Sequence, residues 1–196
     1  MATTPTAAPL TTLATTPAST ATTTAPATTT TTFVKTRAFY ERTCESRISS
    51  GYGPPGITIP ILDIGPVALL AFDPEWLATN TYFMEPTSDG RYEGIKFPLV
   101  VNHTAVGPVT VTVPEPDRDH VRLVYDPGRF SPRWEEADHT VKFGVCSELD
   151  AQYNGGFVVN TPTCARILVR DDGVDGSEWF TQIPFGVPVD ECPPEG

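Results

Sequence analysis

Residues 154–170 read NGGFVVNTPTCARILVR, and this stretch decides the fold. It divides into a turn, a short apolar strand, a second turn at residues 160–162 and a second strand at residues 164–170. Short runs of Val, Ile and Phe bounded by Gly, Pro and Asn are typical of β-strands. The stretch therefore predicts two consecutive strands, and the second of them begins on a cysteine.

The same pattern recurs along the chain in both directions. Residues 109–113 place three valines on one face and two threonines on the other, and residues 121–125 alternate in the same way. This period of two is typical of a strand with one buried face. We expect residues 95–102 and 107–113 to pair with each other as neighbouring strands.

Helical signals are few. Asp73 stands before Pro74, which predicts one helical turn at residues 73–77 with Asp73 as its N-cap. No long stretch shows helical periodicity, and Pro and Gly separate short apolar runs. With about eight or nine short strands, the sequence predicts an all-β fold, a single antiparallel immunoglobulin-like β-sandwich.

The composition divides the chain into two parts. Residues 1–32 hold sixteen Thr, eight Ala and four Pro, without charge, aromatic side chain or Gly. Such a segment buries too little apolar surface to offset its chain entropy, so we expect a disordered stalk or a plain disordered tail. Residues 33–196 are predicted to form one disulfide-bonded domain.

The cysteines predict an oxidising compartment. There are four, at Cys44, Cys146, Cys164 and Cys192. Their spacing is not that of a zinc site, and an even number in an acidic, strand-rich chain indicates two disulfides. Four cysteines allow three connectivities. Cys146 and Cys164 lie on the more polar parity of their strands, which predicts a Cys146–Cys164 bond if the strands are neighbours, and leaves Cys44–Cys192 by elimination.

The charge and the hydropathy limit the partners. The net charge of −11 disfavours nucleic acid and anionic membrane surfaces, because like charges repel. No apolar run is long enough for a transmembrane segment, and residues 1–20 do not resemble a signal peptide. We expect a leader or an anchor to have been trimmed upstream. No phosphate or dinucleotide motif is present, so we expect no cofactor.

Three sets of residues are candidate sites. The acidic turn of Asp171, Asp172 and Asp175 could bind calcium through its carboxylates, although a solvated hairpin tip explains it as well. The tryptophans Trp76, Trp134 and Trp179 are candidate exposed platforms for sugars or partner proteins. Trp134 stands among charges in an expected loop and is the better candidate for a partner contact, whereas Trp179 is expected in the core. Hydrolase motifs are absent, but a triad could still form in space around a histidine.

Short motifs follow one another in a fixed order along the domain: GPVALL at 65–70, PVTVTVP at 108–114, VRLVYD at 121–126, VKFGVC at 141–146, NGGFVV at 154–159, Cys164, and IPFG at 183–186 before the last cysteine. This ordered set resembles a family of secreted or membrane-anchored β-sandwich proteins of actinobacteria. The resemblance implies an exported cell-envelope domain and brings no catalytic residues. The Thr-rich prefix departs from the family pattern.

These observations together predict a non-enzymatic module, secreted or in the cell envelope, that binds or displays a protein or glycan partner. One alternative is a structural surface protein that self-associates through an exposed sheet edge. The other is a secreted hydrolase whose active site follows no known motif.

Overall fold

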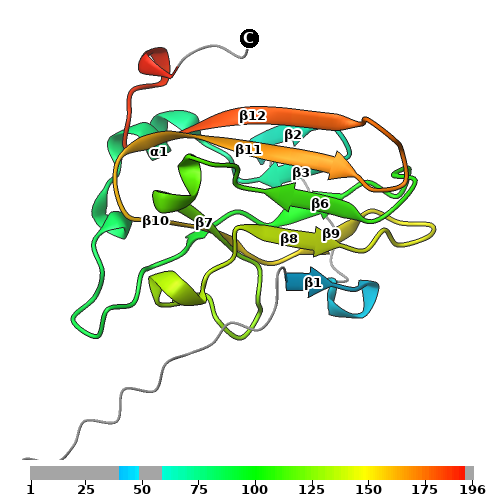
Figure 1. Ribbon diagram of the computed structural model, residues 1–196, viewed down its shortest axis with the longest axis horizontal. Coiled ribbons are helices and arrows are strands. Elements are labelled where there is room, and N and C mark those ends of the chain that lie inside the picture. The colour runs from blue at the N-terminus through cyan, green and yellow to red at the C-terminus, as the bar shows by residue number, and fades with distance from the viewer. Residues whose placement is uncertain (1–39, 49–58, 193–196) are drawn as a thin grey trace, which may run out of the picture. The chain divides into compact units, whose positions relative to one another are not determined.

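A computed structural model of the chain describes residues 40–48 and 59–192 (Figure 1). The predicted stalk, residues 1–32, lies outside the described residues. Strands dominate the described part, which confirms the predicted all-β class. The strands are β1 (Tyr40–Arg42), β2 (Ile61–Ile64), β3 (Val67–Leu70), β4 (Ile95–Lys96), β5 (Leu99–Val101), β6 (Val109–Thr112), β7 (Val121–Val124), β8 (Thr140–Phe143), β9 (Ala151–Tyr153), β10 (Gly156–Val159), β11 (Thr163–Asp171) and β12 (Glu178–Phe185).

Helical elements are short. The single α-helix of the described residues is α1 (Pro74–Thr79), and the 3-10 helices are η1 (Cys44–Ser46), η2 (Tyr82–Met84), η3 (Asp117–Asp119), η4 (Trp134–Glu136) and η5 (Val189–Glu191). The predicted cap of α1 is confirmed: Oδ1 of Asp73 accepts a hydrogen bond from the backbone N–H of Trp76 at 3.0 Å. Pro74 fits the first helical position, where no backbone donor is needed.

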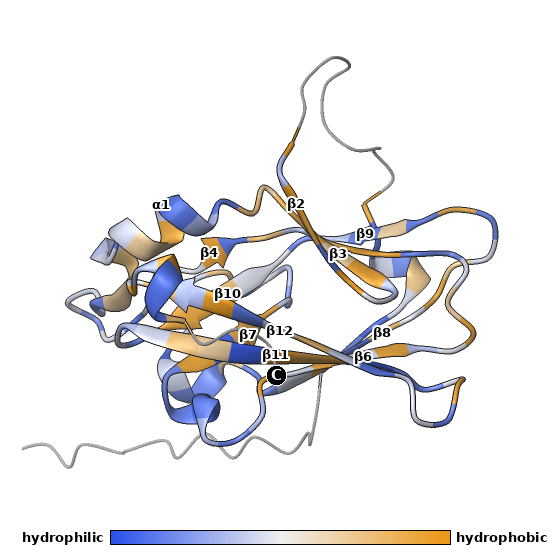
Figure 2. Ribbon diagram, turned by 90° about the horizontal axis from the view of Figure 1, so that it is seen from above, coloured by the Kyte–Doolittle hydropathy of each residue, from blue (hydrophilic) through white to orange (hydrophobic). Residues whose placement is uncertain are grey.

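The strands form three sheets. A five-stranded sheet has the order β1-β8-β6-β11-β12, a four-stranded sheet the order β2-β3-β5-β9, and a three-stranded sheet the order β4-β10-β7. Figure 1 looks onto the five-stranded sheet, with β12 at its upper edge, and Figure 2, seen from above, places β2, β3 and β9 behind it. All described strand pairs are antiparallel except β1 and β8, so the prediction of a purely antiparallel fold is wrong at that pair.

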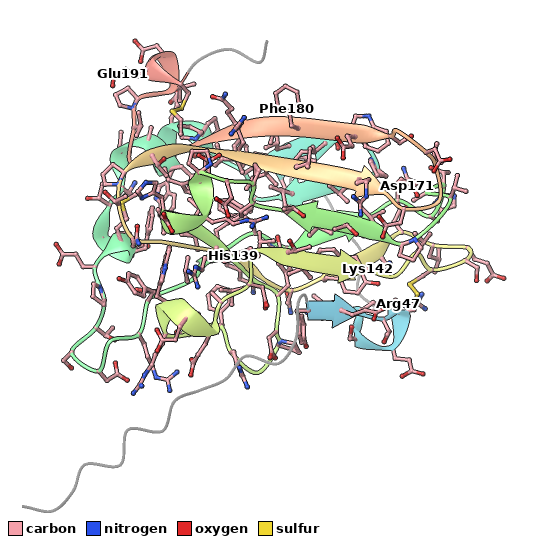
Figure 3. The ribbon with its side chains drawn as sticks, viewed as in Figure 1. Arg47, His139, Lys142, Asp171, Phe180 and Glu191 are labelled. Carbon is pink, nitrogen blue, oxygen red and sulfur yellow. A yellow bond between two sulfur atoms is a disulfide. The ribbon has the colours of Figure 1, made fainter. Side chains whose placement is uncertain are left out.

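One hydrophobic core joins the three sheets. In β6 the valines are buried and the threonines half-buried, as the alternation predicts. The core cluster also takes Leu69 from the four-stranded sheet and Phe157 from the three-stranded sheet, so the sheets share a single interior. At the open edge of the five-stranded sheet, Phe180 on β12 points away from the core and is 41% exposed (Figure 3).

The opening stretch, residues 154–170, contains two strands of different character. All four residues of β10 are buried, so this strand is covered on both faces. In β11 the residues alternate, with Arg166 and Arg170 exposed on the outer face. The two strands lie in different sheets, and the turn at residues 160–162 carries the chain from one sheet to the other.

The expected pairing of residues 95–102 with residues 107–113 is wrong. Residues 95–102 contain two strands, β4 and β5, which belong to different sheets. Pro98 lies between them, and its missing N–H interrupts a ladder of backbone hydrogen bonds. β6, in turn, pairs with β8 and β11 rather than with β5.

The two disulfides are present, but the predicted pairing is wrong. The structure joins Cys44 to Cys146 and Cys164 to Cys192, instead of Cys146 to Cys164 and Cys44 to Cys192. The prediction required β8 and β11 to be neighbours, and β6 lies between them. It also carried the alternation of β8 as far as Cys146, whereas β8 ends at Phe143 and Cys146 is 3% exposed, inside the core.

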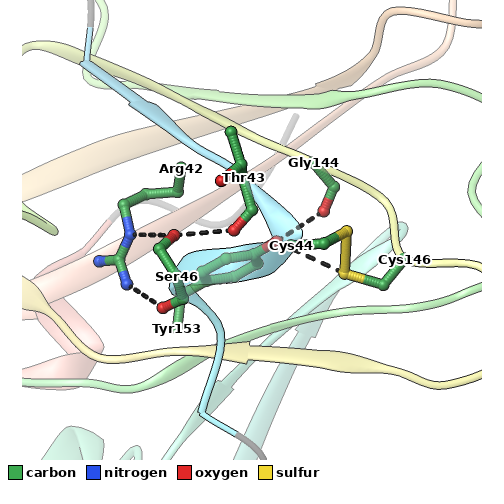
Figure 4. Close-up of a disulfide and its surroundings, with 7 residues drawn as sticks. All are labelled: Arg42, Thr43, Cys44, Ser46, Gly144, Cys146 and Tyr153. Carbon is green, nitrogen blue, oxygen red and sulfur yellow. Dashed lines mark hydrogen bonds between the residues drawn. A yellow bond between two sulfur atoms is a disulfide. The ribbon is translucent and has the colours of Figure 1, made fainter.

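Strand register explains the observed bonds. β1 runs parallel to β8 with Arg42 opposite Phe143, so the two chains leave the sheet side by side and Cys44 meets Cys146 (Figure 4). At the other edge, β11 and β12 are antiparallel with Cys164 opposite Pro184. The chain turns after β12 and brings Cys192, just after η5, back to Cys164.

Candidate functional site

A cleft of about 450 Å³ opens beside α1. Its walls come from α1, from η2, from β4 and from the loop after β7, and they carry Trp76, Tyr82, Lys96 and Phe130. These elements are far apart in sequence, and the short helix α1 presents Trp76 outward because the next residue, Leu77, is fully buried beneath it. The cleft is therefore lined by aromatic rings that the chain does not cover.

The rings stand in a fixed arrangement. Trp76 stacks on Phe83, with ring centroids 6.0 Å apart and planes 25° apart, and Phe83 is buried. Tyr82 meets Trp76 edge to face, at 6.2 Å and 83°. Trp76 is still 38% exposed and Tyr82 is 62% exposed. A buried ring thus supports Trp76 from one side, and the remaining surface of the indole is available to a ligand.

A second cleft of about 210 Å³ shares two walls with the first. Lys96 and Phe130 line both clefts, and the second adds Asp126, Asn154 and Gly155. We call the two clefts together the aromatic groove. Phe130 is 37% exposed where they meet.

Charged groups of both signs surround the aromatic groove, with carboxylates in excess. Asp73 and Glu93 line the first cleft, Asp126 lines the second, and Lys96 is the cation common to both. One oxygen of Asp126 accepts the N–H of Gly128 at 2.9 Å, and one oxygen of Asp73 caps α1. The second oxygen of Asp126 lies 3.7 Å from Nε of Arg129. Asp73 keeps further acceptor capacity, because an ionised carboxylate has about four lone-pair sites.

Hydrogen bonds behind the groove hold its wall. The guanidinium of Arg42 donates to the backbone carbonyls of Tyr125 and Asn154, the latter at 3.2 Å. The Tyr125 hydroxyl donates to the carbonyl of Phe97 at 3.0 Å, and the Phe97 N–H donates to the carbonyl of Gly155 at 2.9 Å. Burial raises the pKa of the Tyr125 phenol far above its ordinary value, so this group remains a donor at every ordinary pH.

Arg42 is the centre of a buried polar cluster next to the first disulfide (Figure 4). It is 2% exposed, donates to the carbonyl and hydroxyl oxygens of Ser46 at 2.7 and 2.9 Å, and lies 5.3 Å from the ring centroid of Tyr153. The Tyr153 hydroxyl in turn donates to the carbonyl of Gly144 at 2.8 Å. We call Arg42, Ser46, Tyr153 and the Cys44–Cys146 bond the Arg42 clamp.

The tryptophan chosen from the sequence is not part of the groove. Trp134 is half-buried on η4, its ring lies 5.5 Å from that of Tyr92, and the Arg122 guanidinium covers it at 4.8 Å. These contacts make Trp134 a packing residue in a small second core. The expectation that Trp179 is buried is wrong, because it is 37% exposed on β12. The sequence signal that Trp76 faces outward was its position next to the apolar Leu77 in a short helix with a predicted cap.

The acidic turn is used inside the protein. Asp171 accepts hydrogen bonds from the backbone N–H groups of Val106, Gly107 and Gly173, which tie two loops together (Figure 3). Asp172 forms ion pairs with Lys142 and Arg170, both at 2.9 Å. Asp175 is exposed. Over residues 40–48 and 59–192, no group of three or more His, Cys, Asp or Glu residues is placed to hold a metal ion.

A contact between a histidine and an aspartate lies elsewhere. Nδ1 of His103 is 2.7 Å from Oδ1 of Asp150, between two exposed loops, and neither residue lines the aromatic groove. The described residues that line the groove include neither His nor Ser. The groove thus has no Ser–His pair among its described lining residues, and its carboxylates are Asp73, Glu93 and Asp126.

Among the described helices, none has the length and apolar character needed to cross a bilayer. Comparison of the chain with protein-family models, with curated proteins and with solved structures finds no match.

Proposed function

We propose that the protein is an exported cell-envelope module that holds a glycan or protein ligand in the aromatic groove and does not act on it chemically. The observation that carries this proposal is Trp76, a large ring that stacks on the buried Phe83 and is still 38% exposed beside a cleft. Rigid aromatic side chains in concave surfaces are typical binding groups.

Two further observations support the environment in this proposal. Two disulfides within a domain of this size favour an oxidising compartment, such as the space outside the cell membrane. The net charge of −11 favours solubility and disfavours nucleic acid. The proposal includes an immunoglobulin-like arrangement of the sheets, which their common core supports, and the actinobacterial envelope that the sequence motifs imply.

The alternative function is self-association through the edge of the five-stranded sheet. β12 is the last strand of that sheet, and its adjacent residues Trp179 and Phe180 are 37% and 41% exposed. An exposed edge with apolar side chains is a template for pairing with a second chain. This alternative and the groove proposal assign function to different tryptophans.

One pair of variants tests the proposal. The full chain, immobilised through a tag, is incubated with cell-envelope material of an actinobacterium and with a printed glycan array, beside Trp76→Ala and Trp179→Ala. Trp179 is the matched control, because its exposed fraction is nearly that of Trp76. We expect Trp76→Ala to lose the retained ligand and Trp179→Ala to keep it. Equal retention by both variants would refute the groove proposal, and a dimer that only Trp179→Ala disrupts would establish the alternative.

A further inference from the structure

We infer that the ligand of the aromatic groove is a neutral glycan chain, with one pyranose ring lying on Trp76. This inference rests on the proposed function and names the ligand class. Its first support is the shape of the aromatic site. Phe83 covers one side of the indole and Tyr82 stands almost perpendicular to it, so a flat apolar surface is bounded by an upright ring. The C–H face of a pyranose is apolar and flat, and it matches such a corner.

The second support is the chemistry around the rings. Asp73 and Glu93 border the first cleft, and Asn154 borders the second. Carboxylates accept hydrogen bonds, and an amide both donates and accepts them. Sugar hydroxyls need this mixture around an apolar ring face. A purely apolar ligand would leave these polar groups without partners, which costs binding free energy.

The third support is charge. Three carboxylates and one lysine line the groove, Arg129 pairs with one of the three, Asp126, at 3.7 Å, and the whole chain carries −11. An acidic glycan or a phosphate-bearing polymer would be repelled by the local excess of carboxylates and by the field of the protein. The charge pattern therefore selects neutral over acidic chains.

The fourth support is extent. The clefts of about 450 and 210 Å³ meet at Phe130 and Lys96, so the groove continues past the Trp76 corner. A chain of several sugar units fits this arrangement better than one unit does. The strand that borders the groove, β4, has two residues, which gives an extended peptide little backbone to pair with.

The test uses the full chain and three soluble hexasaccharides in isothermal titration calorimetry. Cellohexaose and chitohexaose are the neutral probes, and hexagalacturonate is the acidic one. We expect one or both neutral probes to bind and hexagalacturonate to bind at least about tenfold more weakly. Trp76→Ala should weaken binding of the neutral probe by more than about tenfold, which is the loss typical of an aromatic residue at the centre of an interface. Trp76→Phe should weaken binding less. The affinity of Trp179→Ala for the neutral probe should stay within about twofold of that of the unaltered chain.

The outcomes separate the two proposals. If Trp76 is required to retain a protease-sensitive envelope ligand and neither neutral probe binds, the glycan inference fails and the binding function stands. If hexagalacturonate binds as tightly as the neutral probes, the charge argument is wrong and the inference fails. If Trp76→Ala retains every ligand, both proposals fail. Mass spectra of the probes after incubation should show intact hexamers, and shorter products would refute a function without catalysis.

Discussion

The Arg42 clamp and the aromatic groove differ in how their polar groups are used. Those of the clamp are buried and paired within the chain, and those of the groove are exposed. In the clamp, Arg42 is 2% exposed, and its guanidinium donates to backbone carbonyls and to a hydroxyl within the chain. In the groove, Glu93 and Lys96 are exposed beside rings that the chain leaves uncovered. The clamp contributes to the stability of the fold, whereas the groove offers hydrogen-bonding groups and apolar surface to another molecule.

The two regions are physically connected. Arg42 donates hydrogen bonds to the carbonyls of Tyr125 and Asn154. Asn154 itself lines the second cleft, and so does Asp126, which follows Tyr125 in the chain. Tyr125 then reaches Phe97 in the wall of the first cleft. The hydrogen bonds of the Arg42 clamp therefore hold the wall of the aromatic groove in place, as a rigid scaffold does for a binding site.

The largest expected effect is on the disulfide of the clamp. Replacing both Cys44 and Cys146 with Ala should lower the free energy of unfolding by about 4–5 kcal/mol, and replacing both Cys164 and Cys192 by about 3–4 kcal/mol, because the closed loop is longer in the first case. The sequence separations are 102 and 28 residues. Urea denaturation of both double variants and the unaltered chain measures this, and the reverse order would show that the clamp is not the dominant constraint.

The disulfides also show what the sequence could and could not predict. The number of bonds and the oxidising compartment follow from counting cysteines, and the half-buried strands follow from alternation that each strand carries in itself. The pairing depended on which strands are neighbours. β6 comes earlier in the chain than β8 and β11 and still lies between them, and no local pattern in those strands reports that order.

The same limit applies to the candidate site. The cap of α1 was predictable because Asp73 and Pro74 act on backbone groups a few residues away. The choice among tryptophans was not, because exposure depends on distant partners. Trp134 is covered by Arg122 and Tyr92, whereas Trp76 lies on Phe83 with part of its ring left open.

The next largest effect should come from Arg42. Arg42→Met removes the donor that serves the Tyr125 and Asn154 carbonyls, and we expect a loss of about 3 kcal/mol in stability because buried acceptors are left unpaired. Arg91→Met is the control: Arg91 pairs with Asp89 on the surface and should contribute no more than about 1 kcal/mol. Thermal or urea unfolding measures both variants. A comparable loss in the two would contradict the assignment of Arg42 to a clamp.

A more conservative variant of Arg42 tests the link between the two regions. If the clamp holds the groove wall, Arg42→Lys should weaken binding of the neutral hexasaccharide even at temperatures where the variant is fully folded. Lys keeps the charge but lacks the planar guanidinium, whose Nη1 donates to the Tyr125 and Asn154 carbonyls while Nη2 and Nε donate to Ser46. Unchanged affinity in a folded Arg42→Lys variant would show that the groove keeps its shape without the clamp.

The smallest effect separates a carboxylate with partners inside the chain from one at the groove. Burial alone would raise the pKa of Asp172, but hydrogen bonds from Lys142, Arg170 and Thr110 outweigh it and hold the pKa of this carboxyl below its ordinary value.

A lowered pKa stabilises the folded state above the ordinary pKa of about 4, and this contribution disappears as the pH falls through the lower, folded-state pKa. Asp172→Asn should therefore cost about 0.5–1 kcal/mol at pH 7, and this cost should shrink as the pH falls below the ordinary pKa of about 4. Glu93→Gln, on the exposed wall of the groove, should change stability by less than about 0.5 kcal/mol at pH 7. Urea midpoints of the three proteins at pH 7, 4 and 2 give the comparison, and an Asp172→Asn deficit that does not depend on pH would mean that its ion pairs contribute no stability through charge.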